Sequence, residues 1–350
     1  MHTMHRVSPR FRRMLPLLCL AAVPLSIGTA VAQSPGPSPA RTSAAVSAAD
    51  RAPRTFSLRA DNDAFDFWML PWNRPDEDYT SGVHLDYDGG DTPWWSRALT
   101  RGRSECVVNA QSCRTSRLEL GQDIYTPSVD VNDPHASATA RPNAGWLYVA
   151  QSARALSVDR LDEFTLTLGV TGPPSLARFT QRLAHEAAPQ FNRPTDWSHQ
   201  IAFEPGAILR YEQQRRAWSS HGSSVGADVI PTGGVSFGNV LTAADVGLRV
   251  RSGWNLAHPW LPEPPSAGFT IEGGLSGQAI ARKLFLDGNT FERGPRVGHE
   301  PFVGTADLGV EFRYRALSLE YRAVNQTRAY AAGPKWHPWA SMVGRVTVGR

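Results

Sequence analysis

The sequence predicts an all-β fold: a transmembrane antiparallel β-barrel of about twelve strands, with one short helix between two of them. Three observations predict it. Apolar and polar residues alternate strictly in many segments, as in Asp-Leu-Gly-Val-Glu-Phe-Arg-Tyr at residues 307–314. Several segments reach about ten residues, the length that a membrane-spanning strand needs. The chain also begins with a secretory leader, so the mature protein is expected to leave the cytoplasm.

The N-terminal region divides into a leader and a linker. Residues 1–32 form a signal peptide, with a basic region, an apolar stretch over 14–27 and the small residues Ala30-Val31-Ala32 at its end. Cys19 lies in the apolar stretch without the small residues of a lipoprotein box, so it is expected to leave with the leader. Residues 33–53 are rich in Ser, Ala and Pro and lack periodicity, which predicts a disordered lead-in. Residues 54–350 form the barrel.

Twelve strand-like segments account for most of the mature chain. They are expected at residues 55–61, 79–88, 114–124, 144–156, 159–171, 199–214, 222–236, 242–253, 267–284, 301–315, 316–328 and 338–350. An even number suits a bacterial outer-membrane barrel. The mean hydropathy of −0.32 is that of an ordinary soluble protein, but alternating strands do not raise such an average. Several arginines fall on the polar face of the strands, which suits a polar lumen or an anionic ligand.

Tryptophans near the ends of the segments predict an aromatic girdle at the two membrane interfaces. They are Trp94, Trp95, Trp146, Trp254, Trp260, Trp336 and Trp339. The chain ends at Val348-Gly349-Arg350, whereas barrel proteins commonly end on an aromatic residue that aids assembly. We therefore expect an atypical end to the last strand.

Cys106 and Cys113 are the two cysteines that the mature chain keeps. They are close in sequence, and the tract between them is polar, as expected of a loop. An oxidising compartment favours a disulfide between them. A metal site is less favoured, because no His or further Cys stands at ligand spacing.

The short helix is predicted within residues 169–186, where Gly and Pro residues end the preceding strand. Ser175 is expected to cap the helix. Apolar residues then fall on one side at helical spacing, while Gln181 and His185, four residues apart, lie on the opposite side. An imidazole above an amide on a helix of a β protein is a candidate catalytic element. The alternative is a polar face that is merely solvated.

Two polar clusters stand at strand ends. Asp61-Asn62-Asp63 follows the first strand, and its oxygens can ligate a hard cation such as calcium or form an Asx turn. Thr80 and Ser81 lie at the start of the second strand, where their hydroxyls can orient a substrate or complete a turn. Residues 234–238 match the G-x-S-x-G pattern, but another alternating strand follows them instead of a helix, so we reject a nucleophile elbow. The sequence contains no phosphate-cradling loop, zinc spacing or nucleic-acid module.

Eight short blocks support a resemblance to a known family. They are Asn62-Asp63, residues 79–82 (YTSG), 121–127 (GQDIYTP) and 141–148 (RPNAGWLY), then Gly172-Pro173 with Gln181 and His185, Glu204-Pro205, residues 286–291 (LDGNTF) and 319–324 (LEYRAV). In this order they resemble the outer-membrane lipid A 3'-O-deacylase family, and they span nearly the whole mature chain. Asn143 stands where the family usually has Tyr, and Phe203 precedes Glu204 where Asn is common.

The resemblance implies a twelve-stranded barrel in the bacterial outer membrane, with its site beside the outer leaflet. It implies a calcium-dependent hydrolase for the ester that attaches the acyl chains at the 3' position of lipid A. By motif, His185 matches the family's general base and Gln181 its neighbour, while Asn62, Asp63 and Thr80 match its other essential polar residues. Asp63 is the residue expected near the cation. The implied partners are lipid A or lipopolysaccharide and membrane lipids; we expect a monomer and no nucleic-acid ligand.

The residues suggest a mechanism of general-base hydrolysis. Neutral His185 would take a proton from water. Calcium held by Asp63, with Asn62 and the hydroxyl of Thr80 or Ser81 beside it, would stabilise the oxyanion. Two alternatives remain open: a Ser–His phospholipase with Ser81 as nucleophile, and a non-enzymatic, porin-like barrel whose polar face lines a pore.

Overall fold

The computed structural model describes residues 52–65, 78–96, 99–127, 140–187, 197–222 and 224–349. The expected signal peptide and nearly all of the expected lead-in, residues 1–51, lie outside the described residues. None of the helices in the described ranges is long and apolar enough to cross a membrane.

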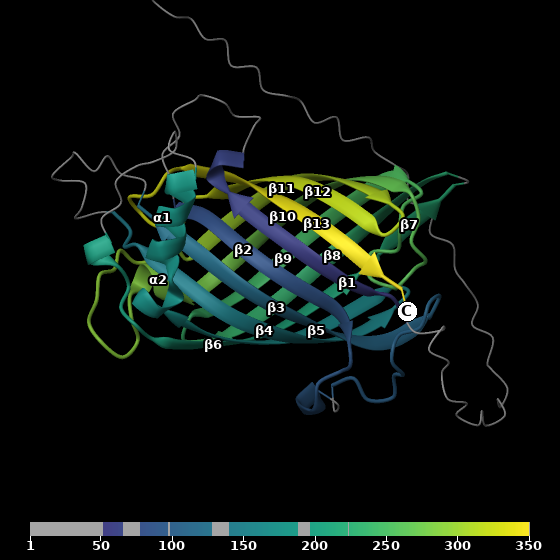
Figure 1. Ribbon diagram of the computed structural model, residues 1–350, viewed down its shortest axis with the longest axis horizontal. Coiled ribbons are helices and arrows are strands. Elements are labelled where there is room, and N and C mark those ends of the chain that lie inside the picture. The colour runs from purple at the N-terminus through teal and green to yellow at the C-terminus, as the bar shows by residue number, and fades with distance from the viewer. Residues whose placement is uncertain are drawn as a thin grey trace, which may run out of the picture. The chain divides into compact units, whose positions relative to one another are not determined.

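Antiparallel strands form one closed wall (Figure 1). They are β1 (Arg54–Asn62), β2 (Asp78–Gly90), β3 (Ser112–Thr126), β4 (Ala144–Ser157), β5 (Arg160–Thr171), β6 (Pro205–Arg215), β7 (Trp218–His221), β8 (Val225–Gly238), β9 (Leu241–Trp254), β10 (Gly268–Lys283), β11 (Phe302–Tyr314), β12 (Leu317–Thr327) and β13 (Trp336–Val348). The short β7 pairs only with β8, while β6 also pairs with β8 and β1 pairs with β13. Leaving out β7, twelve of these described strands close the ring, which confirms the predicted barrel.

Two helices accompany the strands among the described residues. The predicted helix is α1 (Ala177–Ala187), between β5 and β6. The second helix is α2 (Leu284–Asp287). It begins at the last residue of the strand expected over 267–284, since β10 ends one residue earlier, at Lys283. The strand expected from residue 199 begins at Pro205, since a 3-10 turn at Trp197–His199 precedes it. In Figure 1 both helices lie at one end of the barrel, here called the α1 end, and the C-terminus lies at the other, the terminal end.

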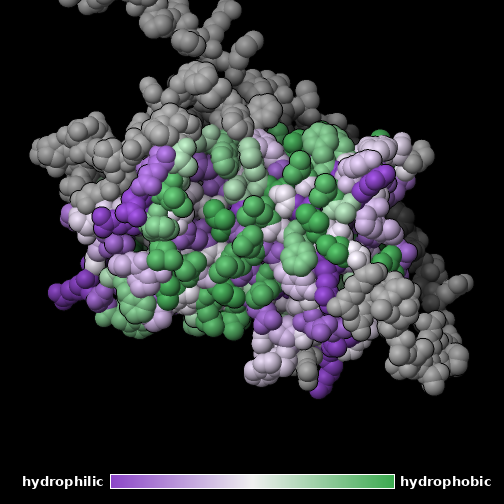
Figure 2. Space-filling view, viewed as in Figure 1, coloured by the Kyte–Doolittle hydropathy of each residue, from purple (hydrophilic) through white to green (hydrophobic). Residues whose placement is uncertain are grey.

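The pleat of the wall separates an apolar outside from a charged lumen. On β1, Phe56 and Leu58 point outward and are about half exposed, while Arg59 and Asp61 point inward. Ion pairs link neighbouring strands along the lumen wall, such as Arg322 Nη2 to Glu272 at 2.7 Å and Arg345 Nη2 to Glu320 at 2.6 Å. Figure 2 shows hydrophobic side chains gathered over the middle of the strands, with more hydrophilic ones toward the ends. This is the alternation expected of a wall with lipid on one side and water on the other.

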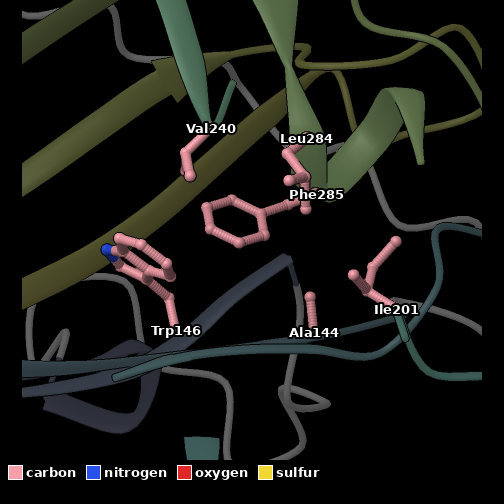
Figure 3. Close-up of a cluster of buried hydrophobic side chains, with 6 residues drawn as sticks. All are labelled: Ala144, Trp146, Ile201, Val240, Leu284 and Phe285. Atoms are coloured by element: carbon pink, nitrogen blue, oxygen red, sulfur yellow. The ribbon is translucent and has the colours of Figure 1, made fainter. Parts of the chain in front are cut away.

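Aromatic side chains fill the lumen at the α1 end. Phe285 of α2 stacks on Tyr125 of β3, with ring centroids 4.8 Å apart, and lies 6.3 Å from the ring of Trp146 on β4. Strands β4 and β10, which carry this contact, lie on nearly opposite sides of the ring. Figure 3 shows Trp146 and Phe285 facing each other; the full cluster is Ala144, Trp146, Ile201, Val240, Leu284 and Phe285. These side chains plug this end of the barrel.

A loop plugs the terminal end. Residues 255–267, which join β9 to β10, turn inward, and Trp260 packs against Leu156 and Leu161 on the far side of the ring. The indole Nε1 of Trp260 donates to the Ser157 carbonyl. A cavity of about 850 Å³, lined mainly by charged and other polar residues, lies in the lumen beside this loop. Its arginines and carboxylates pair with one another, as in Arg210 Nη1 to Asp245 at 2.6 Å on the same lumen wall.

Both plugs use tryptophans that were expected in the girdle, and that expectation is wrong for them. Trp146 and Trp260 are buried inside the barrel, and Trp339 packs inward against Tyr79 and His337. The physical reason is the pleat: each of these residues falls on an inward position of its strand or loop. Trp94, Trp254 and Trp336 are exposed at segment ends, as a girdle requires.

The predicted disulfide between Cys106 and Cys113 is confirmed, with an S–S distance of 2.03 Å. It ties the β2–β3 loop to the beginning of β3. Cys113 is fully buried and packs in the same cluster as Trp260, so the disulfide also supports the terminal plug.

The two plugs predict that the protein does not conduct ions as a porin does. In planar bilayers we expect no steady channel steps from the wild type, because aromatic side chains and the 255–267 loop obstruct the lumen. Removing both obstructions with Trp146→Ala, Phe285→Ala and Trp260→Ala should make brief openings appear. Stable, ohmic steps from the wild type would favour the porin-like alternative.

Candidate active site on the outer wall

The α1 segment is fastened tightly to the outside of the barrel. The 3-10 turn Pro173–Ser175 leads into α1, and Gln122 Nε2 of β3 donates to the Ser175 carbonyl at 2.6 Å. Gly145 of β4 lies directly beneath: a Cβ there would sit 2.1 Å from Ser175 Oγ and 2.3 Å from Ala177 Cβ. The wall and the helix therefore approach as closely as backbone allows, and only glycine fits at position 145 without displacement.

Ser175 does not cap α1, contrary to the expectation from sequence. Its hydroxyl donates backward to the Gly172 carbonyl at 2.6 Å, and the side chain is fully buried. Leu176 then adopts a left-handed backbone with φ 61°, and α1 begins at Ala177. The serine stabilises the turn before the helix, and its burial against the wall prevents it from reaching the helix amides.

The polar side of α1 faces the barrel and its apolar side faces outward. Gln181 is only 5% exposed and His185 is half-buried, whereas Leu176, Phe179 and Leu183 are each more than half exposed. The alternative of a merely solvated polar face is therefore wrong. A helix on a soluble protein normally has the reverse arrangement, since burial favours apolar groups.

Gln181 is held by a tryptophan that follows α1 in the chain. Trp197 Nε1 donates to Gln181 Oε1 at 2.8 Å. The Trp197 ring is itself buried, in a cluster with Ala177 of α1 and Ile124 of β3. His185 lies one helical turn beyond Gln181 on the same face. The wall, the helix and Trp197 thus fix the side from which His185 projects.

Four other predicted residues gather at the α1 end of β1 and β2. Asn62 ends β1, and its Oδ1 accepts the amide of Ala64 at 2.7 Å, which is an Asx turn. Asp63 begins the following 3-10 turn and is buried. Ser81 pairs across the sheet with Asn62. Thr80 is the extra residue of a bulge between Tyr79 and Ser81, and its hydroxyl contacts that of Thr126 at 2.5 Å.

Asp61 belongs to the other side of the wall. Its carboxylate accepts from Tyr79 at 2.8 Å and from Ser341 at 2.6 Å, and it lies 3.5 Å from both Arg59 Nε and His84 Nε2. The pleat thus directs Asp61 into the lumen network, while Asn62 points outward with Phe56 and Leu58. Asp61 and Asn62 cannot serve one outward-facing cation.

The α1 residues and the strand-end residues adjoin through one wall residue. Ser81 lies opposite Asn62 on one side and opposite Ile124 on the other. Ile124 in turn packs against Ala177 and Trp197, the partner of Gln181. Asn62 and Ser81 therefore adjoin the part of the outer wall that α1 covers, while Asp63 is buried in the 3-10 turn after β1, which contacts β2 and β13.

The donor set suits a hard cation rather than zinc. Asp63, Asn62, Thr80 and Ser81 offer a carboxylate, an amide oxygen and two hydroxyls, all oxygen donors of the kind that calcium binds. In the parts of the chain that the structure describes, no group of three or more His, Cys, Asp and Glu side chains is placed to hold a metal. A calcium ion would therefore need backbone carbonyls and water as further ligands.

Glu204 ties together three loops at the α1 end. Its buried carboxylate accepts from Thr290 N at 2.6 Å, Asn239 Nδ2 at 2.8 Å and Asn289 Nδ2 at 3.2 Å. Burial acts to raise the pKa of Glu204, but the hydrogen bonds from Thr290, Asn239 and Asn289 outweigh it and lower the pKa. Phe203, beside it, is exposed, and Asn143 is buried where its carbonyl accepts the amide of Ile201 at 2.9 Å. Neither departure from the family pattern falls on the residues of the candidate site.

Several residues that build the site were not singled out from the sequence. Gln122, Thr126 and Gly145 lie in the blocks that carry the resemblance but had been given no role. Only their position in these blocks could have drawn attention to them, because the sequence of a strand does not show which other element packs on a given glycine or glutamine. Nothing in the sequence indicated a role for Trp197, because its hydrogen-bond partner Gln181 belongs to a different element.

Comparisons with known proteins agree with this architecture. A family model described as outer membrane protein LpxR matches residues 17–348. Among solved structures, the chain is similar to LpxR from Salmonella typhimurium, with 16% identity and a TM-score of 0.68 over 83% of this chain and 99% of that one. It is also similar to the β domain of the Bordetella autotransporter Brka, with 13% identity and a TM-score of 0.42 over 85% of this chain and 99% of that one. The first likeness shows a shared fold, and the second is too remote to carry an argument. No curated protein matches.

The close approach at Gly145 predicts the effect of adding one methyl group. Gly145→Ala should push α1 off the wall and destabilise its docking by about 1–3 kcal/mol, the usual cost of overpacking. Trypsin should then cleave faster after Arg178 and Arg182. The control is Gly344→Ala on β13, where the added Cβ would meet only Leu319 Cδ2, at 3.8 Å. Equal cleavage of the two variants would contradict the tight docking.

The hydrogen bonds to Glu204 predict an acid-sensitive clamp. Glu204→Gln should lower the free energy of unfolding by about 1–3 kcal/mol near neutral pH, the scale for hydrogen bonds to a charged group. Because folding lowers the pKa of Glu204, its contribution is complete above the ordinary value of 4.5 and is lost as the pH falls through the folded value. Thermal unfolding of both proteins at pH 7 and pH 3 should show their midpoints converging in acid. A constant difference would rule out the ionised carboxylate as the cause.

Proposed function

Because the chain belongs to the family of the outer membrane protein LpxR and forms an outer-membrane β-barrel, we propose that it is a calcium-dependent hydrolase that removes the acyl chains at the 3' position of lipid A. The observation that carries the proposal is the inward-turned polar face of α1. A buried glutamine and a half-buried histidine lie on the side of α1 that faces the barrel, and the pairings of Ser81 with Ile124 and with Asn62 lead from there to the polar residues at the ends of β1 and β2.

The position of this group suits a lipid substrate. The α1 end carries the long connections that hold α1 and α2, as the extracellular side of an outer-membrane barrel does. α1 and the wall residues Asn62 and Ser81 lie on the outside of the wall, where membrane lipid approaches, rather than in the plugged lumen. An enzyme that acts on a lipid of the outer leaflet needs its reactive groups at this level and on this side.

His185 is assigned the general base. Its imidazole takes a proton from a water molecule, whose oxygen attacks the ester carbonyl carbon. The tetrahedral intermediate then collapses: the bond between that carbon and the sugar oxygen breaks, and the proton returns from His185 to the sugar oxygen. The products are a free fatty acid and a 3' hydroxyl. Gln181, which accepts a hydrogen bond from Trp197, keeps this face of the helix in place.

The oxyanion needs positive charge or donors beside it. A bound calcium ion would supply that charge, with Asp63 as its carboxylate ligand and Asn62 and the hydroxyl of Thr80 or Ser81 as further oxygen donors. The turn formed by Asn62 and the bulge at Thr80 hold these donors at the ends of their strands. The Thr126 hydroxyl limits the rotation of the Thr80 side chain.

The base assignment predicts a large loss on substitution. His185→Ala should lower lipid A deacylation by ~10²-fold or more, because a general base contributes on that scale. Mass spectrometry of lipid A from cells that express each protein measures it. His221→Ala, an exposed histidine at the terminal end, is the matched control and should retain full activity. Both variants should run faster on gels unheated than boiled, which shows that the barrel is folded. Near-normal turnover by folded His185→Ala would remove His185 from the mechanism.

The metal assignment predicts opposite outcomes for two neighbouring carboxylates. Asp63→Ala should be inactive at ordinary calcium and bind calcium weakly in titration calorimetry, since a carboxylate is a strong ligand for this ion. Asp61→Asn should retain activity, because Asp61 lies in the lumen network. Asparagine is the better control there, since alanine would leave Arg59 and His84 without their buried partner. Chelation should abolish deacylation, calcium should restore it, and zinc should not.

Two results would overturn parts of this mechanism. Full activity in excess chelator would discard the calcium and favour Ser81 as a nucleophile, which a trapped acyl-enzyme would support. Equal loss in both carboxylate variants would mean that Asp61 acts in catalysis from the lumen side.

A further inference from the structure

The outward face of α1 is an apolar surface without a protein partner among the described residues. It consists of Leu176, immediately before the helix, and Phe179 and Leu183, which are 54%, 53% and 54% exposed. The docking of the helix through Gly145, Gln122 and Trp197 prevents it from rotating to bury these side chains. In water, three large exposed apolar side chains on so short a segment would be unfavourable.

Leu176 shows that the structure turns this surface outward at a cost. Its left-handed backbone, with φ 61°, is disfavoured for a residue with a Cβ by roughly 1–2 kcal/mol. In this conformation the leucine side chain points away from the wall and is exposed. A strained residue that displays an apolar side chain indicates a surface that is stabilised by something outside the chain.

The apolar surface continues the lipid-facing belt of the barrel. The helix stands over Ile124 and Gly145, which pair across β3 and β4. Four residues further along the same strands, Leu120 and Val149 form an outward row and are about half exposed, and Leu168 of β5 lies beside them. Leu147 lies between that row and the helix and is half-buried. Between the helix and this row, the outward positions of β3, β4 and β5 carry no charged side chain; the outward charges Arg114, Arg160 and Asp162 lie near the other end of these strands.

Charged groups border the apolar surface on the helix itself. Arg178, Arg182 and Glu186 are exposed, and the guanidinium of Arg182 lies 5.5 Å from the centre of the Phe179 ring. An arginine beside an aromatic ring, with leucines on one side, is typical of helices that lie in a membrane interface. The stem and ring contact acyl chains there, and the charge reaches the headgroups.

We propose that α1 is an interfacial helix whose face of Leu176, Phe179 and Leu183 lies among the acyl chains of the outer membrane leaflet, with Arg178 and Arg182 at the level of the anionic headgroups. The occupant of this surface is membrane lipid. The proposal depends on the outer-membrane location of the barrel and not on any hydrolytic activity.

Spin labelling measures the depth of this face directly. Leu183→Cys and Phe179→Cys would each carry one nitroxide, since Cys106 and Cys113 are joined in a disulfide and Cys19 belongs to the expected leader. Glu186→Cys on the same helix is the matched control. The proteins would be placed in vesicles of phosphatidylethanolamine and phosphatidylglycerol, and gel mobility before and after heating would show that each is folded.

The two relaxation agents, oxygen and a water-soluble nickel chelate, distinguish lipid from water. Labels at 183 and 179 should collide several-fold more with oxygen than with nickel, whereas the label at 186 should show the reverse. Nickel access at 183 and 179 equal to that at 186 would overturn the proposal. Low access to both agents would also overturn it, because it would mean that a protein surface, such as a second copy of this chain, covers the face.

Discussion

Closure of the sheet on itself is the constraint on which the rest of this structure depends. Once β1 pairs with β13, every wall residue faces either the lumen or the surroundings, and the choice alternates with each step along a strand. Arginines and carboxylates on inward positions pair with one another along the lumen wall, while leucines and valines on outward positions meet lipid. The same rule separates Asp61 from Asn62, which are adjacent in sequence and lie on opposite sides of the wall.

The candidate site lies where a helix covers the outer face of the wall. A bare outer wall offers a lipid only apolar side chains, so a hydrolytic site on it needs polar groups from another element. α1 supplies them by turning Gln181 and His185 toward β3 and β4, and its close seat on Gly145 keeps them there. The bulge at Thr80 and the turn at Asn62 add polar groups at the strand ends, above the apolar belt.

The strands were predictable because alternation is a local property of the sequence. Residues 307–314, for instance, show the pleat directly, and they fall in β11. The faces of α1 were also predictable from its spacing, but their directions were not: helical periodicity separates Leu183 from Gln181 without saying which of them meets the wall. Trp146 and Trp260 were misplaced for a related reason, since a tryptophan at a strand end has the same local signature whether it points into lipid or into a plug. The contacts of Trp197 with Gln181 and of Gly145 with Ser175 join separate elements, and no local pattern contains them.

The β1–β13 pairing has a consequence for how the chain assembles. The other pairings in the wall join strands that are neighbours in sequence or are separated only by the short β7, so they can form as each hairpin is completed. Only the β1–β13 pairing joins the first strand of the sequence to the last, with Arg54 opposite Val348. Until the last strand arrives, β1 presents an open edge, and such edges invite pairing with other chains. The time between the emergence of β1 and the arrival of β13 is therefore the period of greatest exposure to aggregation, and a chaperone that shields the β1 edge would protect the whole fold.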